Sequence, residues 1–146
     1  MSLANLVSIG RLKAHKAEKI EIERLFAAAE TSLSDARIEM ISAGTRLDTA
    51  YKCIMQSALA ALLANGYRPS TNQPGHQQTT IQTLTLTIGI TPERMTLLDA
   101  FRRARNLSDY EGDPIEDDMA RECVEAAAAL LADVRVWIKN NRPDLA

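Results

Sequence analysis

The sequence predicts an all-α protein with five helices in a single domain. Alanine, which favours helices over strands, occurs 22 times among the 146 residues. The six glycines and five prolines cluster at a few junctions, and the stretches between them carry apolar residues at helical spacing. No domain boundary is visible, so we expect one domain over residues 1–146, with residues 1–15 as an N-terminal arm.

The first two predicted helices cover residues 16–40 and 45–65. Each has apolar residues at spacings of three and four, which place them on one face. The second helix has the more regular pattern, comprising Leu47, Tyr51, Ile54, Met55, Ala58, Leu59, Leu62 and Leu63. Asn65-Gly66 ends it, because glycine tolerates the left-handed conformation that closes a helix.

Residues 79–90 fit two patterns. Leu84, Leu86 and Ile88 occupy alternate positions, which is typical of a strand, whereas Ile81, Leu84 and Ile88 also have helical spacing. The rest of the sequence contains no clear partner strand, and an unpaired strand leaves its backbone groups unsatisfied. We therefore predict a short helix.

The last two helices have clear start signals. Thr91-Pro92-Glu93 supplies a capping hydroxyl, a proline at the first position and an acidic first turn, and Asn106 could close this helix. The final helix begins at Asp113-Pro114 with Glu116, Asp117 and Asp118 in its first turn, and it ends before Pro143.

Composition restricts the class of protein. A net charge of −2 excludes a protein that is basic overall, although a local basic site is compatible with it. Cys53 and Cys123 fall within apolar helical patterns and indicate small buried residues in a reducing compartment. No apolar run has the length of a membrane span, and the N-terminus lacks a secretion signal, so we expect a cytoplasmic protein without a membrane partner.

The strong catalytic motifs are missing from the sequence. It contains no phosphate-binding glycine-rich loop, no Gly-x-Ser-x-Gly, no His-Glu-x-x-His and no Cys-x-x-Cys. The two histidines, His15 and His76, lie in separate segments. We therefore predict neither a metal site nor a cofactor.

One unusual polar stretch lies in the fourth predicted helix. It contains Arg102, Arg103, Arg105, Asn106, Asp109 and Tyr110. Arg102 and Arg105 share a face, whereas Arg103 points elsewhere and has Asp99 as a possible ion-pair partner. In one interpretation, the cations stabilise the end of the helix through its dipole. In the other, Arg105 and Asn106 form a phosphate or nucleotide site, because a guanidinium fork matches phosphate oxygens.

His76 follows the turn Gln73-Pro74-Gly75. It is either a solvated loop histidine or part of the same site, which would require its loop to fold towards Arg105.

The stretch Arg102–Tyr110 resembles the signature region of HEPN domains, small helical bundles of prokaryotic toxin–antitoxin, defence and nucleotide-related systems. Asp48–Lys52, Ala64–Pro69 and Pro74–His76 also resemble HEPN-type sequences, in the same order along the chain. The resemblance implies an up-and-down bundle of four to five helices, usually a homodimer.

The resemblance also implies roles for individual residues. Catalytic HEPN members are metal-independent ribonucleases in which an arginine is followed, after four to six residues, by a histidine. Arg105 occupies the arginine position, Asn106 follows it, and Tyr110 stands at the histidine position. A phenol with a pKa near 10 is a poor general base at neutral pH, but it can hydrogen-bond to a nucleic-acid base or stack on one. His76 is the alternative source of an imidazole.

These observations predict a homodimeric module that binds RNA or a nucleotide without efficient catalysis. The expected ligand-binding residues are Arg102, Arg105, Asn106, Asp109 and Tyr110. Its setting would be a toxin–antitoxin or stress pair, with an antitoxin or nucleotidyltransferase as partner. One alternative is an active ribonuclease that uses Arg105 with Tyr110 or His76. The other is a purely structural protein–protein module in which Arg105 and Tyr110 belong to an interface network.

Overall fold

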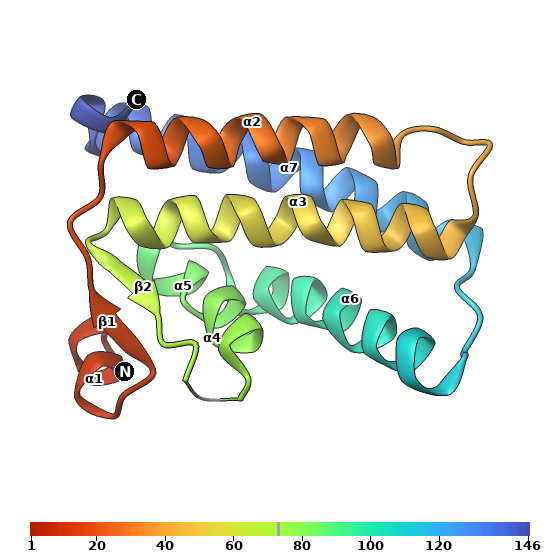
Figure 1. Cartoon of the computed structure of the whole chain (residues 1–146), viewed down its shortest axis with the longest axis horizontal. Helices are drawn as coiled ribbons and strands as arrows, with labels where there is room; N and C mark the ends of the chain where they lie inside the picture. The colour runs from red at the N-terminus through yellow and green to blue at the C-terminus, as the bar shows by residue number, and fades with distance from the viewer. Residues whose placement is uncertain (73) are drawn as a thin grey trace.

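The structure, a computed structural model, describes residues 1–72 and 74–146 and confirms the all-α prediction. Four long helices build an up-and-down bundle, in which successive helices run in opposite directions (Figure 1). They are α2 (Lys19–Ala36), α3 (Ala43–Ala64), α6 (Pro92–Glu111) and α7 (Asp117–Asn141). None of the helices in the described ranges combines the length and apolar character needed to cross a membrane.

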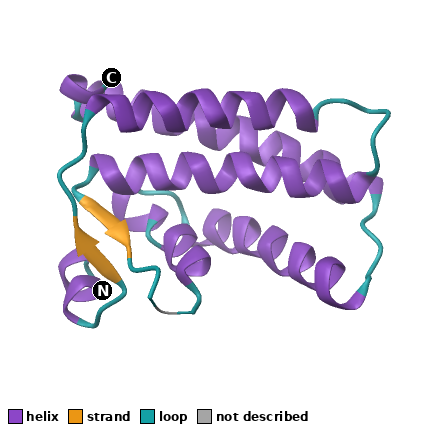
Figure 2. Ribbon diagram, in the orientation of Figure 1, coloured by secondary structure: helices purple, strands orange, loops and turns teal. Residues whose placement is uncertain are grey.

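Shorter elements precede α2, connect α3 to α6 and follow α7 (Figure 2). They are α1 (Leu3–Ser8), β1 (Leu12–Ala14), β2 (Tyr67–Pro69), α4 (His76–Gln82), α5 (Leu84–Thr87) and the 3₁₀ helix η1 (Pro143–Leu145). Helices α4 and α5 lie between α3 and α6 in the chain, and α4 packs against both of them.

Helix α3 lies at the centre of the bundle and makes its most extensive contacts with α2 and α7. Five of its alanines are fully buried: Ala50, Ala58, Ala60, Ala61 and Ala64. Such small side chains let neighbouring backbones approach closely. The thiols of Cys53 and Cys123 show this approach, because each donates to a backbone carbonyl of the opposite helix, that of Ala127 at 3.9 Å and that of Leu47 at 3.8 Å. Both cysteines are buried, as predicted.

The boundaries of the first two long helices are set by local capping. Helix α2 is shorter than the helix predicted over residues 16–40. A capping box between Glu18 and Glu21 marks its start, and it ends at Ala36. The helix predicted over residues 45–65 is confirmed as α3. Asn65 is its C-cap, and Gly66 follows with φ +92° in the left-handed region.

The segment over residues 79–90 is mainly helical, as predicted, but it forms two short helices, and residues 88–90 lie beyond the second. A break at Thr83 separates α4 from α5, and the Thr83 hydroxyl donates to the carbonyl of Thr80 at 2.7 Å. Ile81 and Leu84 are fully buried, so the helical spacing of the apolar residues identified the core face. Helix α4 begins earlier than expected, at His76.

Two predicted boundaries in the second half of the chain are wrong. Asn106 does not close its helix: α6 continues to Glu111 and ends at Gly112, whose φ of +75° is readily adopted only by glycine. The last helix begins at Asp117, and Pro114 lies in the irregular segment that precedes it. The predicted cap at Thr91 is confirmed, because its hydroxyl accepts from the Arg94 amide at 3.1 Å.

The N-terminal arm has structure that the sequence analysis did not predict. Strand β1 pairs antiparallel with β2, with Leu12 opposite Pro69 and Ala14 opposite Tyr67. Leu12 is buried with Leu6 of α1 and a leucine of α3, so the arm forms its own small apolar cluster. The expectation that no strands form was wrong here, because three-residue strands are too short to show an alternating pattern.

Core substitutions in α7 should separate buried from exposed positions. Ile138 is 0% exposed, and we expect Ile138→Ala to lower the free energy of unfolding by about 2–5 kcal/mol through lost burial and a cavity. Val136 on the same helix is 58% exposed, and Val136→Ala should change it by less than about 1 kcal/mol. Urea denaturation followed by circular dichroism measures both. Equal losses would contradict the placement of these side chains.

The two thiols should be unreactive in the folded protein. Burial raises the pKa of the Cys123 thiol to about 12 and also raises that of Cys53, so neither is a thiolate at pH 8. We expect a chromogenic disulfide reagent to label neither thiol in the native protein and both after unfolding in guanidinium. Rapid labelling of the native protein would show that the α3–α7 contact opens.

Candidate functional site

A polar pocket of about 330 Å³ lies between the start of α4 and the second half of α6. We call it the α4–α6 pocket. The residues that line it are Gly75, His76, Gln77, Gln78, Arg102, Arg105, Asn106 and Tyr110. His76 and Arg105 therefore line the same pocket, so the loop that carries His76 folds towards Arg105. Of the predicted site residues, Asp109 alone is not part of the lining.

Local structure explains how the two halves of the pocket meet. Arg102, Arg105 and Asn106 are spaced by three and four positions, so one face of α6 carries all three. On the other side, Gly75 precedes α4 with φ +82°, and its left-handed conformation turns the chain directly into the first turn of that helix. Because α4 packs on α6, the residues that begin α4 face this part of α6.

Arg105 is held by groups from two helices. Its Nε donates to Oδ1 of Asp48 on α3 at 2.6 Å, and Oδ2 of Asp109 lies 3.7 Å from the same nitrogen. The guanidinium carbon lies 5.2 Å from the centre of the Tyr51 ring, within the range of a cation–π contact. Partial burial lowers the pKa of Arg105, but the hydrogen bond and the charges of the two aspartates outweigh burial and raise it overall.

The other two arginines share Asp99. Arg102 Nε donates to Asp99 Oδ1 at 2.7 Å, and Arg103 Nε lies 3.5 Å from Oδ2, as the sequence predicted for Arg103. The hydrogen bond to Asp99 raises the pKa of Arg102. Arg103 is mainly exposed and does not line the pocket.

The helix-dipole interpretation of this arginine cluster is wrong. Helix α6 extends to Glu111, and its last turn contains no basic residue. Because the dipole effect acts within the last turn, Arg102, Arg103 and Arg105 lie too far from the helix end to be explained by it. All three arginines instead pair with aspartates, and Arg102 and Arg105 also line the α4–α6 pocket.

Tyr110 stands at the edge of the pocket and is 86% exposed. Its ring is therefore available to a ligand without displacing protein contacts. Asp109, the neighbouring predicted residue, points its carboxylate towards Arg105 rather than into the pocket.

The sequence analysis missed the α3 residues that contact the pocket, Asp48 and Tyr51, and most of its α4 wall. Tyr51 is only 2% exposed, and its hydroxyl donates to Oε1 of Gln77 at 2.9 Å. Burial raises the pKa of Tyr51 to about 12, although the nearby Arg105 lowers it slightly, so the phenol is protonated at neutral pH. Asp48 and Tyr51 are three residues apart on α3, within a segment that resembles HEPN sequences. In the sequence, this spacing indicates that the two side chains lie on the same face of the helix.

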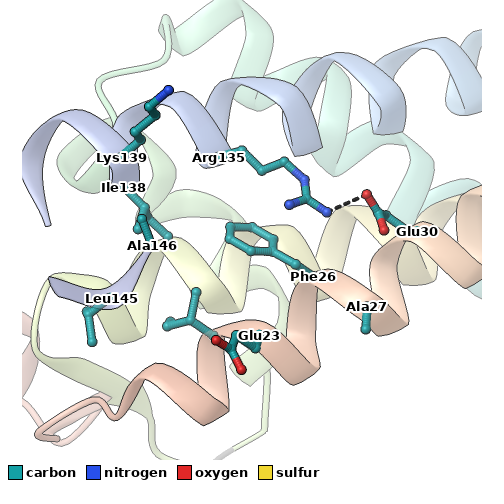
Figure 3. Close-up of a pocket in the computed structure, with 10 residues that line it drawn as sticks. Glu23, Phe26, Ala27, Glu30, Arg135, Ile138, Lys139, Leu145 and Ala146 are labelled. Atoms are coloured by element: carbon teal, nitrogen blue, oxygen red, sulfur yellow. Dashed lines mark hydrogen bonds and ion pairs between the residues drawn. The ribbon is translucent and has the colours of Figure 1, made fainter. Parts of the chain in front are cut away.

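A second pocket, of about 470 Å³, lies between α2 and α7 (Figure 3). Its apolar lining residues include Ile22, Phe26, Ile138 and Leu145. Arg135 stacks over Phe26 at 4.5 Å and bonds to Glu30, so these two charges satisfy each other. Although this pocket is larger, the α4–α6 pocket combines cations, amides and an imidazole, and we take it as the candidate site.

Removing the Tyr110 side chain should leave the fold intact. Because the ring is almost fully exposed, we expect Tyr110→Ala to change the free energy of unfolding by no more than about 0.5 kcal/mol. Thermal denaturation of the variant beside the wild type measures this. A large loss would mean that the ring is covered in the native protein, for example by a second copy of the chain.

Comparison with known proteins supplies no family assignment. No protein-family model matches the sequence, and no curated protein matches it. The resemblance to HEPN domains therefore rests on the four sequence segments alone. The case for a function rests on the residues around the α4–α6 pocket.

Proposed function

We propose that the protein binds a phosphate-bearing ligand, RNA or a nucleotide, in the α4–α6 pocket and catalyses little or no reaction on it. The observation that carries this proposal is the convergence of Arg102, Arg105, Asn106, His76 and Tyr110 on one pocket. Guanidinium groups bind phosphate oxygens through charge-assisted hydrogen bonds. An exposed aromatic ring offers a face for base stacking.

The dimensions of the pocket support a small ligand or a single nucleotide of a longer chain. A volume of about 330 Å³ falls at the lower end of the range for ligand pockets, roughly 300–1,000 Å³. Amide side chains line it beside the arginines, and amides supply both donors and acceptors to a base edge. A net charge of −2 leaves such binding dependent on this local cluster.

The ribonuclease alternative has one observation in its favour, the presence of His76 at the same pocket as Arg105. An imidazole can move a proton near neutral pH, and an arginine can stabilise the charge that develops on a phosphate. In that alternative His76 or Tyr110 replaces the usual histidine. A homodimer, and an antitoxin or nucleotidyltransferase partner, belong to the proposal only through the HEPN resemblance.

Arg105→Ala tests the proposal directly. We expect it to weaken binding of uridine 5′-monophosphate and of a short single-stranded RNA about ten- to a hundredfold, because it removes charge-assisted hydrogen bonds worth about 1.5–3 kcal/mol. Calorimetry with the nucleotide and fluorescence anisotropy with labelled RNA measure the two affinities and show which source of phosphate is preferred.

Arg103→Ala is the matched control, since it removes the same charge from the same helix outside the pocket. Equal losses in both variants would point to non-specific charge attraction, and absence of binding by the wild type would refute the proposal. Unchanged ligand binding with a weaker dimer in Arg105→Ala would favour the structural module. RNA cleavage in the presence of a metal chelator, lost in both Arg105→Ala and His76→Ala, would favour the ribonuclease.

A further inference from the structure

Tyr51, on α3, contacts both walls of the α4–α6 pocket. Its ring lies under the guanidinium of Arg105 on α6, and its hydroxyl bonds to Gln77 on α4. The side chain is buried in the central helix α3, and its pKa of about 12 keeps the hydroxyl protonated as a donor. One buried side chain thus contacts two pocket residues, one on each wall.

The hydrogen bond from Tyr51 determines which atoms of Gln77 remain for a ligand. Oε1 of Gln77 accepts from the phenol at 2.9 Å, so the amide is oriented with this oxygen towards α3. Its Nε2 group carries two N–H donors and donates to no other residue in the described ranges 1–72 and 74–146. Gln77 therefore offers the pocket donors.

Arg105 is arranged in a similar way. Asp48 occupies its Nε at 2.6 Å, whereas Nη1 and Nη2 donate no hydrogen bond within the part of the chain that the structure describes. A guanidinium held at Nε can still bind an oxyanion through its two terminal nitrogens. Arg105 and Gln77 thus both present N–H groups, and the partner they jointly suit is a ligand rich in acceptor oxygens.

We propose that Gln77 is a phosphate-contacting residue of this site and that Tyr51 is its positioning residue, orienting the Gln77 amide and supporting the Arg105 guanidinium. This inference rests on the proposed binding function and adds the side chains that select a phosphate oxygen. It commits the ligand to contact the pocket through its phosphate, whether that group belongs to a free nucleotide or to an RNA backbone.

The experiment uses Tyr51→Phe, which keeps the ring under Arg105 and removes only the hydroxyl. We expect Tyr51→Phe and Gln77→Ala each to weaken binding of uridine 5′-monophosphate about three- to tenfold, the effect of one hydrogen bond. Uridine itself should bind equally weakly to the wild type and both variants. The controls are Tyr67→Phe and Gln82→Ala, which change the same residue types outside the pocket.

A double-mutant cycle separates positioning from general stability. If Tyr51 acts through Gln77, adding Tyr51→Phe to Gln77→Ala should cause little further loss of affinity. The side-chain NH₂ signal of Gln77 in a ¹⁵N spectrum should also shift on nucleotide addition in the wild type, and more weakly in Tyr51→Phe.

The outcomes distinguish this inference from the function on which it rests. Wild-type binding that is lost in Arg105→Ala but unchanged in Tyr51→Phe and Gln77→Ala would overturn the inference and leave the proposed function standing. Fully additive losses in the double variant would overturn the positioning role of Tyr51. If the wild type binds neither nucleotide nor RNA, both the function and the inference fail.

Discussion

The close packing of α3 between α2 and α7 is the constraint on which the rest of the structure depends. Alanines on α3 leave little side-chain bulk at these contacts, and Cys53 and Cys123 reach the backbone of the facing helix. Tight contacts of this kind sum many small dispersion terms and leave little freedom to slide. The axis and rotation of α3 are therefore fixed relative to both neighbours, and the outer helix α6 is placed against a rigid surface.

The packing of α3 also fixes the base from which two of its residues contact the candidate site. Asp48 and Tyr51 extend from the same α3 that forms the core, and they contact Arg105 and Gln77 on elements that pack less extensively. A flexible arginine on the surface loses side-chain entropy when it binds a ligand, whereas Arg105 is already held at Nε and over an aromatic ring. The buried Tyr51 thus supports the pocket from α3, whereas the exposed Tyr110 offers its ring to a ligand.

Much of the fold could be predicted because helix signals are local. The spacing of apolar residues, the Thr91 cap and the Asn65-Gly66 stop act within one or two turns, and the structure confirms each of them. Predictions failed where a competing local signal was stronger or where pairing was distant. Gly112 closes α6 in place of Asn106, and β1 finds its partner strand some fifty residues later in the chain. Strands of three residues carry too little pattern to be recognised alone.

By itself, the sequence determined the all-α class, the long helices and the face of α6 that carries Arg102, Arg105 and Asn106, because these follow from the 3.6-residue period. Only the tertiary structure decided that His76 lies at the same pocket as Arg105, and that Asp48, 57 positions away, holds its Nε. It also decided the contacts of Tyr51 with Arg105 and Gln77, whereas in the sequence Tyr51 is one residue of an apolar stripe within a HEPN-like segment. Contacts between distant residues depend on how helices pack, and no local period encodes that arrangement.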